Sequence, residues 1–252
     1  MTKIVMEPKT EYVSLFDCRI NNLSYNQVLD LIPEFLKQNT FHYFVTLNPE
    51  IVVHSKNNII IKEYLAGASL CFADAIGILL AARILKKELL KKVTGIDLVQ
   101  KIIQKNHSLY CIGAKEKVIE LAVNNIKENN PEINILGYRH GYFAPSEEDE
   151  IIKDIQKQKP DIMLVGLGVP RQENFIMKLR QKLNYGIAIG VGGTFDILAG
   201  VKKRAPRLMR KLYMEWIYRG FKEPGRIIKW SFLWSFIKLV IWEYSRSFRR
   251  RR

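Results

Sequence analysis

Short apolar runs alternate with longer segments of mixed character along the first 200 residues of the chain. Five of these runs predict strands, and Ser69–Ala73 is a further short apolar run that ends at Asp74. The five predicted strands are Phe41–Leu47, Leu109–Gly113, Ile133–Gly137, Asp161–Val165 and Gly186–Val191. Continuous apolar runs are typical of strands buried on both faces, as in parallel sheets.

The segments between these runs carry helix signals. Asn48-Pro49-Glu50 directly follows a strand and predicts a helix start, with Asn48 as the cap. Ser146 with Asp149 three residues on predicts a capping box. The predicted helices are Lys115–Asn129, Ser146–Gln158 and Arg171–Leu183. This alternation predicts an α/β protein with an open, mostly parallel, Rossmann-like sheet and helices on both faces.

The character of the chain changes at Gly200–Pro206, so we expect a catalytic core over residues 1–201 and a basic helical appendage over residues 202–252. Within the appendage, Trp230–Trp242 is the most apolar piece, but it is shorter than the roughly 20 residues a spanning helix needs. Trp, Phe and Leu with basic neighbours favour a helix lying in the membrane interface. The alternative is an ordinary amphipathic helix packed on the core or on a partner.

The net charge of +15 lies almost entirely in the appendage. Residues 202–252 hold 16 of the 40 Lys and Arg but only 3 of the 25 Asp and Glu, together with all four Trp. Such a segment on a nearly neutral core predicts contact with an anionic surface. The N-terminus lacks a signal-peptide run, which favours the cytoplasm. The cysteines, Cys18, Cys71 and Cys111, are far apart and predict buried free thiols.

Residues that could take part in binding or catalysis lie at or just after the ends of the apolar runs. Thr46, Asn48 and Asp74 follow or end two apolar runs, and the loops Gly166–Gln172 and Gly190–Asp196 follow two others. Ligands of open parallel sheets bind beyond the carboxyl ends of the strands, so these groups predict one cleft. The alternative for each is a plain cap or turn, and neither glycine-containing loop matches a phosphate-binding motif.

Metal ligation is not predicted. The four histidines lack the HxxxH spacing, and the chain contains no Asp-x-Asp motif. We therefore expect no metal and no cofactor. If the cleft binds a diphosphate, cations of the protein must offset its charge, and Arg is well suited to this.

Taken together, these segments resemble the WecG/TagA/CpsF glycosyltransferases, glycosyltransferase family 26. The resemblance runs from about Phe41 to Lys229. The motifs that carry it are TLNPEIV (Thr46–Val52), FADAIGI (Phe72–Ile78), VTGIDL (Val93–Leu98), HGYF (His140–Phe143), GLGVPRQENF (Gly166–Phe175), GVGGTFDILAG (Gly190–Gly200), KRAP (Lys203–Pro206) and EWIYR…EPGR (Glu215–Arg226). One departure is Ala75, where the family commonly has Gly after the aspartate.

The resemblance implies a GT-E type fold and an inverting, metal-independent hexosyltransferase. It implies transfer of N-acetylmannosamine or a related hexose from a UDP-sugar to a polyprenyl-diphosphate-linked sugar, in cell-surface polysaccharide or teichoic acid synthesis. Such a protein would lie at the cytoplasmic face of the cell membrane as a peripheral protein, with anionic lipid as a partner.

By matching motif positions, the resemblance also implies residue roles. Asp74 corresponds to the general base, which takes the proton of the attacking hydroxyl. The substrate-binding residues would be Thr46, Asn48, Gln172, Lys203, Arg204, Arg219 and Arg226. Arg219 and Arg226 would stabilise the leaving diphosphate.

Two other functions remain open from the residues. A pI near 9.7 with interleaved basic and aromatic residues would suit a nucleic-acid-binding protein, although Trp230–Trp242 is too apolar for a phosphate-binding surface. The other is a membrane-attached scaffold without activity. A homo-oligomer is a further alternative, in which other copies of the chain, rather than lipid, cover the apolar tail. The resemblance favours the transferase and no nucleic-acid partner.

Overall fold

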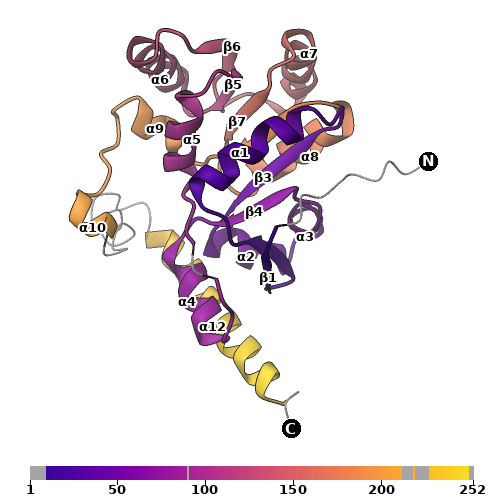
Figure 1. Ribbon diagram of the computed structural model, residues 1–252, viewed down its shortest axis with the longest axis vertical. Coiled ribbons are helices and arrows are strands. Elements are labelled where there is room, and N and C mark those ends of the chain that lie inside the picture. The colour runs from indigo at the N-terminus through magenta and orange to yellow at the C-terminus, as the bar shows by residue number, and fades with distance from the viewer. Residues whose placement is uncertain (1–9, 90, 212–217, 219–226, 250–252) are drawn as a thin grey trace.

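A six-stranded parallel sheet forms the centre of the protein (Figure 1). The computed structural model describes residues 10–89, 91–211, 218 and 227–249. The strands are β3 (His42–Leu47), β4 (Leu70–Ala73), β5 (Ser108–Gly113), β6 (Asn134–Arg139), β7 (Ile162–Gly166) and β8 (Ile187–Gly190). They lie in the order β4-β3-β8-β7-β5-β6, and each pairing is parallel. The predicted fold class is therefore confirmed.

Helices cover both faces of this sheet. One face packs against α2 (Pro49–Ser55), α3 (Ile59–Ala66), α4 (Ile76–Ile84), α7 (Glu148–Gln158), α8 (Arg171–Lys182) and α12 (Ile227–Arg249). The other packs against α1 (Tyr25–Leu36), α5 (Gly95–Ile103), α6 (Glu116–Asn129) and α9 (Thr194–Leu198). A short helix, α10 (Arg207–Lys211), follows the last strand of the sheet and α9.

The two faces of the sheet have separate apolar cores because strand side chains alternate. In β3, Tyr43 and Val45 belong to one core, while Phe44 between them belongs to the other. All six residues of β3 are buried, including the polar His42 and Thr46, as expected for the predicted buried strand. The three cysteines are buried free thiols, also as predicted.

A small antiparallel hairpin protects the edge of the sheet beside β4. It consists of β1 (Tyr12–Leu15) and β2 (Cys18–Asn21), and it was not expected from the sequence pattern. The Asn21 Oδ1 atom accepts a hydrogen bond of 2.8 Å from the Cys71 backbone N–H. An edge strand otherwise exposes unpaired backbone groups, so this side chain satisfies one of them.

The predicted capping box at Ser146 and Asp149 is wrong. The helix α7 begins at Glu148 and follows a 3₁₀ turn over Pro145–Glu147. In this turn the Glu147 carboxylate accepts a hydrogen bond of 2.7 Å from the Ala144 backbone N–H. Pro145 favours an earlier first turn because its φ angle is already helical and it lacks an N–H. Glu147 therefore takes the role that the pattern assigned to Asp149.

The C-terminal helix α12 packs on the core beside α2 and α4 (Figure 1). Phe236 and Val240 are buried in the core on that face, and the Phe236 ring lies 5.2 Å from the Phe16 ring. Trp234 and Ile241 remain 64% and 60% exposed. The packing of Phe236 and Val240 agrees with the amphipathic helix packed on the core, whereas the membrane-interface interpretation stays a prediction. Across the described ranges, no helix is long and apolar enough to cross a membrane.

Replacing Phe236 with alanine should test whether α12 is an integral part of the core. Because Phe236 is 3% exposed, we expect Phe236→Ala to lower the free energy of unfolding by about 3–5 kcal/mol. Trp234→Ala, on the exposed side of the same helix, should change it by about 0.5 kcal/mol or less. Urea unfolding measures both, and equal losses would contradict this packing.

Candidate active site at the carboxyl edge of the sheet

Four neighbouring strands bring the predicted site residues to one edge of the sheet. The order β4-β3-β8-β7 makes the carboxyl ends of these strands adjacent. Asp74 follows β4, Thr46 and Asn48 lie at the end of β3, and Gln172 lies in the first turn of α8 after β7. The loop after β8 runs from Val191 to Gly193 and leads into α9. The structure therefore brings together four of the predicted residues.

Thr46 and Asn48 each make a hydrogen bond within the protein. The buried Thr46 hydroxyl donates to the Gly190 carbonyl at 2.8 Å, which ties the end of β3 to the end of β8. Asn48 Oδ1 accepts from the Ile51 N–H at 3.1 Å and caps α2, as the sequence predicts. Both side chains therefore shape this edge of the sheet in addition to the substrate role that the resemblance implies.

Gln172 joins the loop after β7 to the loop after β8. Its Oε1 atom accepts a hydrogen bond of 2.9 Å from the Gly192 N–H, and its Nε2 donates to Glu173 Oε1 at 3.0 Å. A Cβ atom at Gly190 would lie 2.4 Å from Gln172 Nε2, closer than atoms can approach. Glycine is therefore required there if Gln172 is to keep its position.

Asp74 is oriented by the start of α5. Its Oδ1 atom accepts a hydrogen bond of 3.1 Å from the backbone N–H of Gly95, the first residue of α5. The N-cap of α4 is Ala75, without a side-chain cap, so Asp74 does not have the capping role for the adjacent helix. A helix N-terminus favours a nearby negative charge. This contact therefore fixes the direction of the Asp74 side chain at the edge of the sheet.

The alanine after Asp74 fits its position without strain. Ala75 has φ −113° and ψ 146°, which lies in the extended region that any residue adopts. This conformation does not require the positive φ that favours glycine. The departure from the usual family residue therefore does not distort the backbone beside Asp74.

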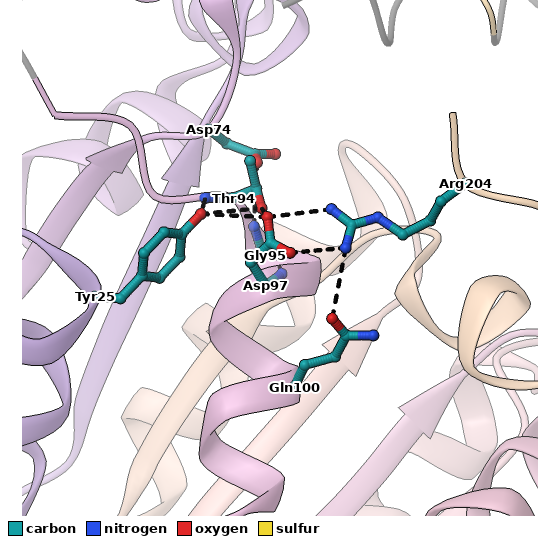
Figure 2. A network of polar contacts seen from close by, with 7 residues as sticks. All are labelled: Tyr25, Asp74, Thr94, Gly95, Asp97, Gln100 and Arg204. Carbon is teal, nitrogen blue, oxygen red and sulfur yellow. Dashed lines mark hydrogen bonds and ion pairs between the residues drawn. The ribbon is translucent and has the colours of Figure 1, made fainter. Parts of the chain in front are cut away.

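A cluster of polar side chains supports the α5 N-terminus beneath Asp74 (Figure 2). Thr94 caps α5, and its hydroxyl donates to Asp97 Oδ2 at 2.6 Å. The Tyr25 hydroxyl from α1 accepts from the Thr94 N–H at 2.9 Å. Two guanidinium nitrogens of Arg204 donate hydrogen bonds to the same carboxylate, at 2.7 Å and 3.1 Å. We call Tyr25, Thr94, Asp97 and Arg204 the α5 clasp.

The clasp stabilises the ionised form of Asp97. Burial alone would raise the pKa of this carboxyl, but hydrogen bonds from Arg204 and Thr94 outweigh it and leave the pKa below the usual 3.8. Burial is also the main reason that the pKa of Tyr25 is raised. The sequence interpretation missed Tyr25, Thr94 and Asp97. The spacing of Thr94 and Asp97, typical of a capping motif, could have identified two of them.

Another Arg joins two of the quoted motifs. Arg171, at the start of α8, donates to the carbonyls of Gly141 and Phe143 at 2.6 Å and 2.5 Å. Its guanidinium also lies 4.3 Å from the centre of the Phe143 ring. The HGYF segment after β6 is therefore held against the loop after β7, and Arg171 holds the flank of the candidate site in place.

The predicted cations of the appendage have different surroundings. Lys203 is exposed, whereas Arg204 binds Asp97 in the clasp. Arg219 and Arg226 lie outside the residues that the structure describes. Asp196 forms an ion pair of 2.7 Å with Lys202. No cluster of three or more His, Cys, Asp or Glu that could hold a metal occurs in the described part of the chain.

Comparison with known proteins agrees with the motifs. The sequence matches the glycosyl transferase WecG/TagA/CpsF family over residues 13–251. It is 35% identical over 224 residues to N-acetylglucosaminyldiphosphoundecaprenol N-acetyl-beta-D-mannosaminyltransferase from Staphylococcus aureus strain MW2, covering 86% of this chain and 87% of that protein. The same identity and coverage hold for the proteins of that name from strains NCTC 8325 and MRSA252.

Arg204→Leu should destabilise the folded protein because it removes both hydrogen bonds to Asp97. We expect a loss of about 1–2 kcal/mol in the free energy of unfolding at neutral pH. Because the pKa of Asp97 is lowered, its contribution is present above pH 3.8 and is lost as the pH falls through the folded-state value. The difference from wild type should therefore shrink in acid.

Lys202→Ala provides the matched control for this measurement. It removes a more exposed ion pair, with Asp196, and should cost about 0.5 kcal/mol or less. Chemical unfolding followed by circular dichroism at several pH values measures both variants. An Arg204→Leu loss that stays constant down to pH 3 or so would show that Asp97 is not the partner that matters.

Proposed function

The chain belongs to the glycosyl transferase WecG/TagA/CpsF family, and from this premise we propose that it transfers N-acetylmannosamine or a related hexose from a UDP-sugar to a polyprenyl-diphosphate-linked sugar. The acceptor class is suggested by the name of its relatives, which act on N-acetylglucosaminyldiphosphoundecaprenol. The product would enter cell-surface polysaccharide or teichoic acid synthesis. The protein is a glycosyltransferase by family, and the choice of sugars is the proposal.

The observation that carries this proposal is the position of Asp74. The side chain is half-buried at the end of β4, and Gly95 at the start of α5 orients one of its oxygens. Thr46, Asn48 and Gln172 come from the adjacent strand ends at the same edge. A carboxylate beside several polar groups, at the edge where open parallel sheets bind ligands, suits a general base in a sugar pocket.

In the proposed reaction, Asp74 accepts the proton of the acceptor hydroxyl. The freed oxygen forms a bond to the anomeric carbon of the donor from the face opposite UDP. The bond between that carbon and the UDP oxygen breaks, and UDP leaves with the electron pair. One displacement of this kind inverts the anomeric configuration and needs no redox step or metal ion. General base catalysis of this type contributes on the order of 10²–10⁴-fold to the rate.

The leaving diphosphate gains negative charge, which cations must stabilise. We assign this role to Arg219 and Arg226, following the family motif EWIYR…EPGR. Lys203, near the start of the appendage, is exposed and is proposed to assist. A substrate role for Arg204 stays a prediction, since its two terminal nitrogens already bind Asp97. Its contact with Asp97 instead suggests that Arg204 holds the first residues of the appendage against α5.

The appendage over residues 202–252, whose helix α12 also packs on the catalytic core over residues 1–201, is proposed to attach the enzyme to anionic lipid at the cytoplasmic face of the membrane. Ile237 and Ile241 are exposed on α12 together with Trp234 and Trp242, and the helix also carries the exposed cations Lys238 and Arg246. Exposed Trp and Ile with basic neighbours suit the interface between headgroups and acyl chains. This location would bring the active site to a lipid-linked acceptor.

Asp74→Asn should abolish transfer while leaving the protein folded. We expect kcat to fall by about 10²–10⁴-fold, because the amide cannot accept the proton yet keeps the size of the side chain. The assay supplies a panel of UDP-sugars with a lipid-linked GlcNAc diphosphate acceptor and measures the product by mass. Asp149→Asn, on the exposed side of α7, is the matched control and should retain full activity. Equal activity of the two variants would exclude Asp74 as the base.

Binding to anionic vesicles should depend on the exposed side of α12. The double variant Trp234→Ser, Ile241→Ser should bind phosphatidylglycerol vesicles at least about tenfold more weakly than wild type, because it removes two apolar groups from the interface. Binding of the wild type should also weaken as salt rises. Sedimentation with vesicles measures both. Unchanged binding of the double variant would place the lipid contact elsewhere.

A further inference from the structure

A carboxyl group that the proposed mechanism does not use is buried directly behind Gln172. Glu173 is the third residue of α8 and is 0% exposed. Carboxylates are almost never fully buried without a cationic partner. Within the described residues, neither Lys, Arg nor His forms an ion pair with Glu173. Burial of this carboxyl in its charged form therefore costs free energy.

The two oxygens of this carboxyl have different surroundings. Oε1 accepts the hydrogen bond from Gln172 Nε2, whereas Oε2 has no hydrogen-bond partner among the described residues. Gln172 in turn accepts from the Gly192 N–H. One short chain of hydrogen bonds therefore runs from Glu173 through Gln172 to the loop after β8, at the edge where Asp74 and Thr46 lie. The orientation of the Gln172 amide depends on Glu173 as its acceptor.

The groups that face Glu173 favour its neutral form. Among the described residues, the charge of Glu50 of α2 disfavours the ionised form, while Tyr64 of α3 is uncharged at neutral pH because its own pKa is raised well above 10. Burial, with a smaller contribution from Glu50, raises the pKa of Glu173 to about 7. Hydrogen bonds from Gln172 and from its own backbone oppose this rise only in part. The carboxyl therefore changes its charge near neutral pH.

We propose that Glu173 is a positioning residue, which in its protonated form holds the Gln172 amide across the two loops and on ionisation loosens them, so that sugar transfer slows. The inference rests on the proposed transferase function. In the neutral form, Oε1 accepts from Gln172 and the second oxygen carries the proton. Loss of the proton strengthens the single bond from Gln172 but leaves a buried charge with no cation among the described residues, and hydrating that charge requires movement of the first turn of α8. That movement displaces Gln172 and Gly192.

The same ionisation affects folding. Because the folded-state pKa lies above the usual Glu value of 4.5, stability is greatest below that value and falls as the pH rises toward about 7. A glutamine at this position keeps an acceptor for Gln172 but carries no charge. Glu173→Gln should therefore melt at a higher temperature than wild type at about pH 8 and at a similar temperature at about pH 5.

The test is the pH dependence of kcat/KM for transfer in wild type, Glu173→Gln and Glu173→Leu. Wild type should lose activity as the pH rises through about 7. Glu173→Gln should keep activity within about threefold at pH 6 or so and lose this step, whereas Glu173→Leu should be at least about tenfold slower at every pH. In Gln172→Ala, which breaks the chain of hydrogen bonds, the step should also disappear. Glu120→Gln, on the exposed side of α6, should retain the wild-type profile.

Different results would overturn the inference and the proposed function. An active wild type whose alkaline step persists in Glu173→Gln would exclude Glu173 as the positioning group. If that variant does not fold, an alkaline step that survives in Gln172→Ala would exclude it equally. A wild type that transfers no sugar from any UDP-donor would contradict the proposed function instead, while the melting temperatures would still report whether Glu173 ionises near neutral pH.

Discussion

The parallel pairing of β4, β3, β8 and β7 is the constraint on which the candidate site depends. It turns residues that are far apart in the chain into neighbours, because the carboxyl end of every parallel strand points to the same edge. The hydroxyl of Thr46 then links β3 to the Gly190 carbonyl at the end of β8, and Gln172 links the next loop to Gly192. The site is therefore a set of loops held together by hydrogen bonds between strand ends.

The α5 clasp connects this edge to the start of the basic appendage. The Gly95 N–H orients Asp74, and Thr94 and Asp97 shape the helix that presents this N–H. Arg204, one of the first residues of the appendage, binds Asp97. The ion pair between Arg204 and Asp97 thus links the helix that orients the proposed base to the start of the tail. A tail that only attached the protein to lipid would not require this connection. The proposed contribution of the tail to catalysis rests on this connection.

Much of this could be predicted from the sequence, because local signals marked the strands and their ends. The largely apolar run of β3 and the cap at Asn48 both predicted what the structure contains. The strand order could not be predicted, since β8 pairs with β3 from a distant part of the chain. Tyr25 and Thr94 are 69 residues apart, and Arg204 lies 107 residues from Asp97, so neither contact has a local signature. Glu173 was missed because burial, rather than its identity, makes it unusual.

The central claim is that sugar transfer takes place at this edge of the sheet, with Asp74 as the base. The most direct measurement is a crystal structure of the protein with UDP and a soluble analogue of the lipid-linked GlcNAc diphosphate acceptor. The account predicts that the acceptor hydroxyl lies about 3 Å from an Asp74 carboxylate oxygen, with UDP over the ends of β3 and β8. Binding of UDP at another edge, or an acceptor hydroxyl beyond the reach of Asp74, would contradict it.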